Sequence, residues 1–166
     1  MERPPFAEAP GPEQESVWDY PRPPAMVPDA RRVRVRLGDA VLADTTRAVR
    51  ILETASPPVF YLPPEDVATA YLHRAPGVSR CEWKGPASYW TVRASDSEVV
   101  EGGAWSYEDP LPDYREIAGY LSFYPARFRC SVDGERVRSQ GGGFYGGWVT
   151  DEIVGPWKGD PGTGIW

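Results

Sequence analysis

Proline and glycine recur along the whole chain, and this feature limits its folds more than any other. There are nineteen prolines and seventeen glycines among the 166 residues, and both residue types are unfavourable inside helices. The seven tryptophans, nine tyrosines and five phenylalanines need burial or ring stacking. A chain of this length makes one domain and buries enough surface to form a core without disulfides or a structural metal. The sequence therefore predicts a strand-rich domain rather than a helical bundle.

Two hairpins are predicted from local patterns. Residues 31–37 (RRVRVRL) alternate between arginine and an apolar residue, which is typical of a strand with one buried face. Gly38 and Asp39 then turn the chain into a second strand, AVLAD. Asp133 and Gly134 lie between FRCSV and ERVRS, and an Asp-Gly pair readily takes the positive φ angles of a tight hairpin turn.

Several other short segments have the branched and aromatic content of strands. They are 48–53, 59–62, 88–94, 103–107 and 119–124. Residues 45–53 also fit a helical turn, and short helices are predicted at 63–74 and 112–120 from their proline, acidic and apolar spacing. The fold class is mainly β, or a β-dominated α+β fold: a compact antiparallel sandwich or small barrel with two short helices.

The N-terminal thirty residues differ in composition from the rest. They hold eight of the prolines and a net charge of −4. Residues 1–16 lack periodic apolar positions, which predicts a disordered, proline-rich acidic tail. Trp18 and Tyr20 need a surface to pack on, so residues 17–30 are predicted to dock in extended form on a single globular β domain, 17–166.

Charge and motif content argue against several functional classes. The formal net charge of −6 disfavours nucleic acid as a partner. Cys81 and Cys130 are too few for a disulfide framework, and the chain has no C-x-x-C pair, so no metal and no cofactor are predicted.

The absence of a leader and of any run near 20 apolar residues predicts a cytoplasmic protein without membrane contact. With one histidine and no G-x-S-x-G motif, a hydrolytic triad has little support. The sequence leaves open whether the chain forms a homo-oligomer.

The segment CEWKGPASYW at 81–90 concentrates chemical groups between a predicted helix and a predicted strand. One interpretation makes Cys81 a nucleophile and Lys84 a cation or proton donor. The alternative is a buried thiol, with a lysine stem that covers a tryptophan face. The structural alternative is favoured, because Glu82 opposes the charge of Lys84.

Glu53 ends an apolar strand segment. Its carboxylate is either solvated at the strand end or paired with Lys84 or with an arginine of the first strand, and pairing would make it a site candidate.

The glycine-rich run GGGFYGGW at 141–148 resembles a phosphate-binding loop only superficially, because no Lys-Ser/Thr pair follows its last glycine. The favoured interpretation is structural: glycine permits positive φ angles or a close approach of the backbone while Phe144 and Tyr145 pack. A ligand-contacting loop is compatible with it.

Several segments together resemble the family known as domain of unknown function 427. They are VWDYPRPP, ILETASPPVFYLPPEDV, CEWKGPASYW, AWSYEDP, IAGYLSFYP and GGFYGGWVTDEIVGPWKGDPGT, from about Trp18 to Trp166. The resemblance implies a compact β protein of the β-tent kind, which is also found in methionine sulfoxide reductase B and in the ligand-binding domain of cereblon. This chain lacks the two zinc-binding C-x-x-C pairs of many β-tents, so metal binding and reductase activity are not carried over. The family is sometimes labelled nucleotidyltransferase, but the chain lacks a Gly-Ser followed by Asp-x-Asp.

These observations lead to one main hypothesis: a domain that binds a small planar or cationic ligand in an aromatic-lined pocket. The predicted ligand-binding residues are Glu53, Trp83, Lys84, Tyr89, Trp105, Tyr107, Tyr145 and Trp148. The alternatives are a small-molecule enzyme that uses Lys84 or Cys81 with Glu53, and a protein-interaction module. Two Trp-Lys-Gly sequences, at 83–85 and 157–159, reflect either related halves of one fold or chance.

Overall fold

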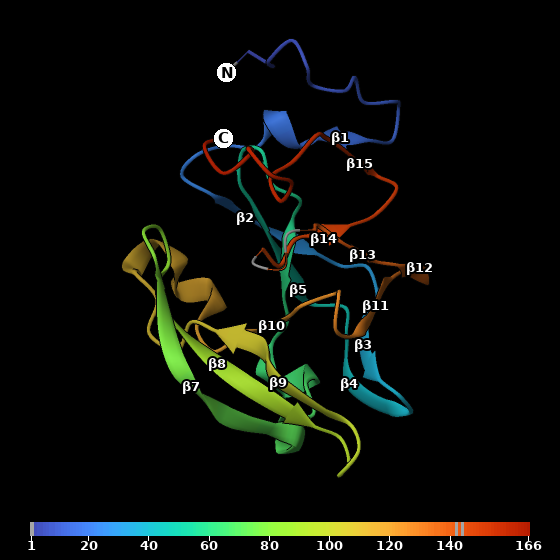
Figure 1. Ribbon diagram of the computed structural model, residues 1–166, viewed down its shortest axis with the longest axis vertical. Coiled ribbons are helices and arrows are strands. Elements are labelled where there is room, and N and C mark those ends of the chain that lie inside the picture. The colour runs from blue at the N-terminus through green and yellow to red at the C-terminus, as the bar shows by residue number, and fades with distance from the viewer. Residues whose placement is uncertain (1, 142, 144) are drawn as a thin grey trace.

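The computed structural model describes residues 2–141, 143 and 145–166, and most of its regular structure is β (Figure 1). The strands are β1 (Glu15–Ser16), β2 (Ala25–Asp29), β3 (Val33–Leu37), β4 (Ala40–Thr45), β5 (Ala48–Leu52), β6 (Val59–Tyr61), β7 (Leu72–Cys81), β8 (Gly85–Arg93), β9 (Val99–Ser106), β10 (Leu121–Phe123), β11 (Arg129–Val132), β12 (Glu135–Arg136), β13 (Arg138–Ser139), β14 (Trp148–Val149) and β15 (Ile153–Val154). The 3₁₀ helices are η1 (Val17–Asp19), η2 (Pro64–Asp66), η3 (Thr69–Tyr71) and η4 (Pro112–Ile117).

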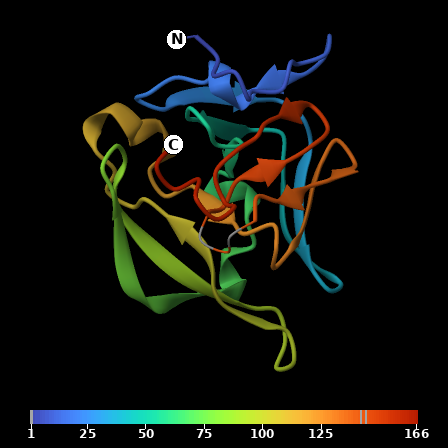
Figure 2. The same cartoon turned by 45° about the horizontal axis from the view of Figure 1, so that its top comes forward.

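The larger sheets are antiparallel and pack against each other as a sandwich. One has the strand order β10-β9-β8-β7, the second β12-β11-β3-β4, and the third β2-β5-β6. One hydrophobic core joins the first two sheets, since Val33 and Val35 of β3 cluster with Val92 of β8 and Phe123 of β10. In the described part of the chain no sheet closes into a barrel. The predicted antiparallel β sandwich is therefore confirmed. Figure 2 shows that the long β7–β8 hairpin lies apart from the β3–β4 hairpin.

Both hairpins that were predicted from turn chemistry are present. Strands β3 and β4 pair around a turn in which Gly38 has a φ of 57°. Strands β11 and β12 pair around Asp133 and Gly134, whose φ angles are 47° and 83°. Positive φ at both central residues of the second turn, and at the first central residue of the first turn, matches the right-handed twist of the flanking strands, so the local sequence was sufficient to specify these turns.

The helix predicted at 63–74 is wrong over most of its length. The chain forms only the short helices η2 and η3, and from Leu72 it enters the long strand β7, so His73 lies opposite Thr91 of β8. Between the two short helices Val67 bridges to Ala43, and the Ala68 N–H donates to the carbonyl of Leu42. Pairing with β4 holds the backbone extended there, and this tertiary contact overrides the local helical preference.

The remaining helix predictions have mixed outcomes. The segment 112–120 contains η4 as a short helix, whereas the alternative helical turn at 45–53 is wrong because Ala48–Leu52 forms β5. The 81–90 segment is not a loop after a helix: it begins at the last residue of β7, turns at 82–84 and continues as the first part of β8. Among the described residues no helix is both long and apolar enough to cross a membrane.

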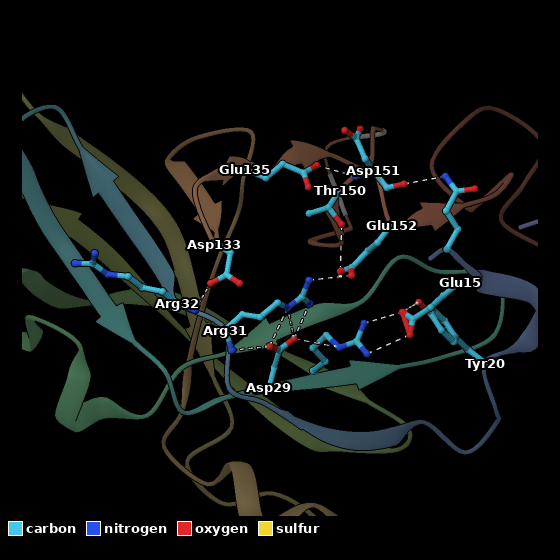
Figure 3. Close-up of polar contacts among 12 residues, drawn as sticks. Glu15, Tyr20, Asp29, Arg31, Arg32, Asp133, Glu135, Thr150, Asp151 and Glu152 are labelled. Carbon is cyan, nitrogen blue, oxygen red and sulfur yellow. Dashed lines mark hydrogen bonds and ion pairs between the residues drawn. The ribbon is translucent and has the colours of Figure 1, made fainter. Parts of the chain in front are cut away.

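The N-terminal and C-terminal segments lie side by side at one end of the molecule (Figure 1). Strand β1 pairs in parallel with β15, and the ring of Phe6 stacks on that of Trp166 with centroids 5.1 Å apart. Below this pairing Asp29 and Glu152 both bind Arg31, as Figure 3 shows. The predicted disorder of residues 1–16 stays a prediction.

Candidate functional site

A cavity of about 300 Å³ lies between strands β5–β6 and the β7–β8–β9 sheet. Two loops complete its wall: the one after β13 and the C-terminal loop. Its lining comprises Ile51, Glu53, Ser56, Pro57, Val59, Tyr61, Ser79, Arg80, Cys81, Lys84, Ala87, Tyr89, Trp105, Tyr107, Tyr124, Gln140, Tyr145, Gly146 and Lys158. The cavity is thus assembled from segments that are distant in the sequence.

Trp105 of β9 is the centre of the aromatic wall. Its ring centroid lies 4.5 Å from that of Tyr124 and 6.4 Å from that of Tyr61, which stands perpendicular to it. The Trp105 indole N–H donates to the Tyr61 hydroxyl at 3.3 Å. Tyr107 lies two residues further along the chain, with its ring centroid 6.1 Å from Tyr61. These contacts hold the rings in fixed orientations, which suits a preformed binding surface.

Three of the tyrosines that line the cavity, Tyr61, Tyr107 and Tyr124, are neutral at physiological pH. Burial raises the pKa of Tyr61 and of Tyr107 far above the ordinary value for a phenol. Burial, together with the nearby Tyr89, raises the pKa of Tyr124 to about 12. Loss of solvation disfavours the phenolate, so these hydroxyls act as neutral hydrogen-bonding groups and not as bases.

Lys84 occupies the turn between β7 and β8 and lines the cavity. The residue is only 8% exposed. Its Nζ lies 5.6 Å from the Tyr107 ring centroid, a distance at which the ring face attracts a cation. Its carbonyl accepts a hydrogen bond of 2.8 Å from the Leu111 N–H, and Gly85 follows with a φ of 100°. Within the described residues its ammonium has no carboxylate partner within ion-pair distance.

Glu53 follows β5 and lines the same cavity as Lys84. Its carboxylate lies 3.7 Å from the Arg22 guanidinium, and the side chain is 26% exposed. The partner is therefore Arg22, which the sequence had not suggested, and not Lys84 or an arginine of β3. Cys81 ends β7 and also lines the cavity, whereas the other cysteine, Cys130, is buried in the core, which raises the pKa of its thiol.

The other predicted ligand-binding residues divide between the cavity wall and the protein interior. Tyr89, Trp105, Tyr107 and Tyr145 line the cavity together with Glu53 and Lys84. Trp83 does not line it; its ring packs against the neighbouring hydrophobic cluster. Trp148 is fully buried, stacks on Phe60 with centroids 4.8 Å apart, and donates from its indole to the Phe123 carbonyl.

Sequence reasoning missed Tyr61, Arg80, Tyr124, Gln140 and Lys158 as cavity residues. Gln140 is 6% exposed and joins two loops of the wall. Its side chain donates to the Lys158 carbonyl at 2.8 Å and accepts from the Gly147 N–H at 3.1 Å. Of the missed residues, Lys158 could have been found from the sequence, because it belongs to the second copy of the repeated Trp-Lys-Gly sequence.

The glycine-rich run has the structural role that was favoured from the sequence. A Cβ on Gly146 would overlap the Trp105 ring, and one on Gly147 would overlap the Gln140 side chain. Gly146 and Gly147 therefore allow the backbone to approach the cavity wall closely. Gly142 and Phe144, which belong to the same predicted segment, lie outside the described residues.

The described residues contain no group of three or more histidine, cysteine, aspartate or glutamate side chains placed to hold a metal ion. The polar chemistry available in this cavity is therefore that of two lysines, one arginine, one carboxylate, one thiol and several neutral hydroxyls and amides.

Two comparisons with known proteins bear on this arrangement. Comparison with curated proteins finds no match to this chain. The sequence model of a family described as a domain of unknown function, DUF427, matches residues 25–138. That range includes Glu53, Lys84 and Trp105, while Tyr145 and Lys158 lie beyond it. Because the match spans well over half of the sequence, the chain belongs to the DUF427 family.

Proposed function

We propose that this protein binds a small planar molecule in the cavity between β5–β6 and the β7–β8–β9 sheet. The observation that carries the proposal is the convergence of aromatic rings from separate segments on one hollow. Trp105 contacts both Tyr61 and Tyr124, and Tyr89, Tyr107 and Tyr145 complete the aromatic lining. Small-molecule sites are typically concave and aromatic, with a few convergent polar groups. A volume of about 300 Å³ corresponds to a ligand of one or two rings, at the low end of such sites.

The concavity favours ligand binding over the interaction-module alternative. A flat aromatic patch would suit a protein partner, whereas Trp105 and Tyr107 are each only 7% exposed and face a hollow. The catalytic alternative uses Lys84 or Cys81 with Glu53 as acid or base, and a hydrogen bond between Glu53 and Lys84 would favour it. The carboxylate of Glu53 pairs with Arg22 instead. The enzyme hypothesis stays a prediction with less support than binding.

A blocking variant tests the proposal. Ser79 is an exposed residue of β7 that lines the cavity, so Ser79→Trp places an indole in the opening without disturbing the core. Ser97→Trp, at an exposed position outside the cavity lining, is the matched control. We expect single-ring and two-ring aromatic fragments to bind the parent protein in ligand-observed NMR, and Ser79→Trp to reduce their affinity at least tenfold.

Two results would count against the proposal. One is that a broad panel of aromatic fragments gives no saturation-transfer signal with the parent protein. The other is that Ser79→Trp and Ser97→Trp bind the fragments equally well, which would place binding elsewhere. Thermal unfolding of each variant verifies that the fold is retained.

A further inference from the structure

Lysine has an unusual distribution in this protein. The chain contains sixteen arginines but only two lysines, Lys84 and Lys158. Both lysines line the aromatic cavity, although they come from the β7–β8 turn and from the C-terminal loop. Of the arginines, only Arg80 is among the lining residues. Elsewhere the fold uses arginine for its cations, so the two ammonium groups are concentrated at one site.

The two Trp-Lys-Gly sequences place their lysines in the same manner. Trp83 packs against the cluster around Trp105, and Trp157 packs against the cluster around Trp18. The glycine after each lysine has a positive φ, 100° at Gly85 and 132° at Gly159. In both copies a partly buried indole anchors the segment, the lysine lines the cavity, and the glycine permits the sharp change of chain direction.

Backbone hydrogen bonds fix both lysines in place. The carbonyl of Lys84 accepts from the Leu111 N–H at 2.8 Å. The Lys158 N–H donates to the Ala55 carbonyl at 2.9 Å, and its carbonyl accepts from the Gln140 side chain at 2.8 Å. These bonds fix the backbone at both lysines, while each flexible side chain keeps the freedom to place its ammonium against a ligand.

The charge of the cavity is unbalanced. Its lining contains Lys84, Lys158 and Arg80 but only one carboxylate, Glu53, which already pairs with Arg22. Neither lysine has a carboxylate within ion-pair distance among the residues that the structure describes. Lys84 is buried, whereas Lys158 is partly buried. A buried ammonium such as that of Lys84 is costly without a counter-ion, since burial removes water that an opposite charge replaces well.

We infer that the ligand is a small planar anion, with its carboxylate or phosphate group held between Lys84 and Lys158 and its ring against the aromatic wall. The inference rests on the proposed function and deepens it by naming the ligand class. It opposes the cationic ligand that the aromatic content alone had suggested, because three cations on the lining would repel such a molecule. Lysine provides a mobile point charge that suits either anionic group.

A charge series on one ring system tests the inference. The probes are 2-naphthoate and 2-naphthyl phosphate as anions, 2-naphthamide as the neutral analogue, and 2-naphthylmethylamine as the cation. Isothermal titration calorimetry in chloride buffer measures the affinity of each. We expect at least one anion to bind ten times or more tightly than the amide, the amine to bind most weakly, and the preference to decrease at high salt. The relative affinities of the two anions separate a carboxylate site from a phosphate site.

The variants Lys84→Gln and Lys158→Gln test whether the two lysines cause the preference for an anion. Each should lower the affinity for the preferred anion about tenfold or more while the amide affinity changes less than threefold. Arg93→Gln removes a charge at an exposed position of β8 outside the cavity lining, and should leave the preference intact. Melting temperatures verify folding.

Three outcomes would overturn the inference. If all four naphthalene probes bind equally, the anion assignment is wrong but the planar-ligand proposal stands. If an anion preference survives in both lysine variants, the anion binds elsewhere. If no probe binds, the inference is also overturned, and the fragment panel with Ser79→Trp decides separately whether the cavity binds any planar ring.

Discussion

At the scale of a single residue, Gly146 shows how closely the cavity wall is packed. A Cβ at this position would overlap the ring of Trp105. Trp105 itself is held by Tyr61 and Tyr124, so its ring has little room to move away. The Trp105 indole can therefore occupy its place in the wall only because residue 146 has no side chain.

Gly146→Ala should destabilise the protein by about 1–3 kcal/mol, because forcing extra atoms into a packed region displaces side chains and backbone. Urea unfolding at equilibrium measures the change in free energy of unfolding. Gly164→Ala is the matched control, since a Cβ there meets no atom within 4 Å, and it should change the stability by less than about 0.5 kcal/mol. Equal effects of the two substitutions would show that the overlap with Trp105 is unimportant.

At the scale of elements, the pairing of β3 with β11 brings like charges together. Arg36 lies directly opposite Arg129, and Arg34 lies opposite Ser131. The Nε atoms of Arg34 and Arg36 are buried without a hydrogen-bond partner among the described residues. The alternation that identified β3 from the sequence thus creates an arginine-rich face. On it Arg36 and Arg129 repel each other across the strands, whereas Arg34 forms an ion pair with Asp44 of β4.

Arg129→Glu should replace this repulsion with an attraction and raise the free energy of unfolding by about 0.5–1 kcal/mol. Chemical denaturation at low salt measures the gain, which should shrink in about 1 M NaCl because salt screens exposed charges. Arg93→Glu is the control, since its cross-strand neighbour is Val99. A loss of stability in Arg129→Glu would mean that the arginine face has contacts other than mutual repulsion.

At the scale of the whole molecule, ion pairs connect the N-terminal segment to the sheets and to the C-terminal segment (Figure 3). Glu15 of β1 binds Arg50 of β5 at 2.8 Å, and Arg50 lies 3.5 Å from Asp29 of β2. Asp29 binds Arg31 at 2.6 Å, and Arg31 binds Glu152 at 2.8 Å. Charges therefore alternate in sign along a path between the two ends of the chain.

These pairs make the stability depend on pH. Burial alone would raise the pKa of Glu15 and of Asp29, but hydrogen bonds and charge from Arg50 and Arg31 outweigh it, so both pKa values lie below the ordinary range. A carboxylate with a lowered folded-state pKa stabilises the protein above its unfolded pKa of about 4, and this contribution is lost as the pH falls through the folded pKa. The protein should therefore lose stability between about pH 5 and pH 2.

Glu15→Gln separates the stabilisation that comes from the Glu15 carboxylate from the other effects of low pH on the protein. At pH 7 the variant should be about 1–2 kcal/mol less stable than the parent, because Arg50 loses a charge-assisted partner. The difference should shrink at a pH low enough to protonate Glu15 of the parent as well. Glu13→Gln, at a neighbouring exposed position, should match the parent at both pH values. A difference that is independent of pH would contradict the ion-pair account.

Predictions from the sequence succeeded where neighbouring residues decide the backbone. The alternation at 31–37 and the Asp133–Gly134 pair act through φ and ψ preferences over a few residues, and both hairpins formed. The helix expected at 63–74 failed because a strand distant in the sequence, β4, pairs with Val67 and Ala68. Local preference is a weak force, and such pairing outweighs it.

Proline, glycine and period-two patterning act locally, and these features were sufficient to predict a strand-rich antiparallel fold. The sequence also marked Trp105 and Trp148 alike as aromatic residues, but only the tertiary structure put one in a cavity wall and the other in the core. The meeting of Lys84 with Lys158 was likewise decided by how the loops and sheets pack. Contacts between distant segments depend on the burial of apolar surface across the whole molecule, and no short sequence pattern encodes that.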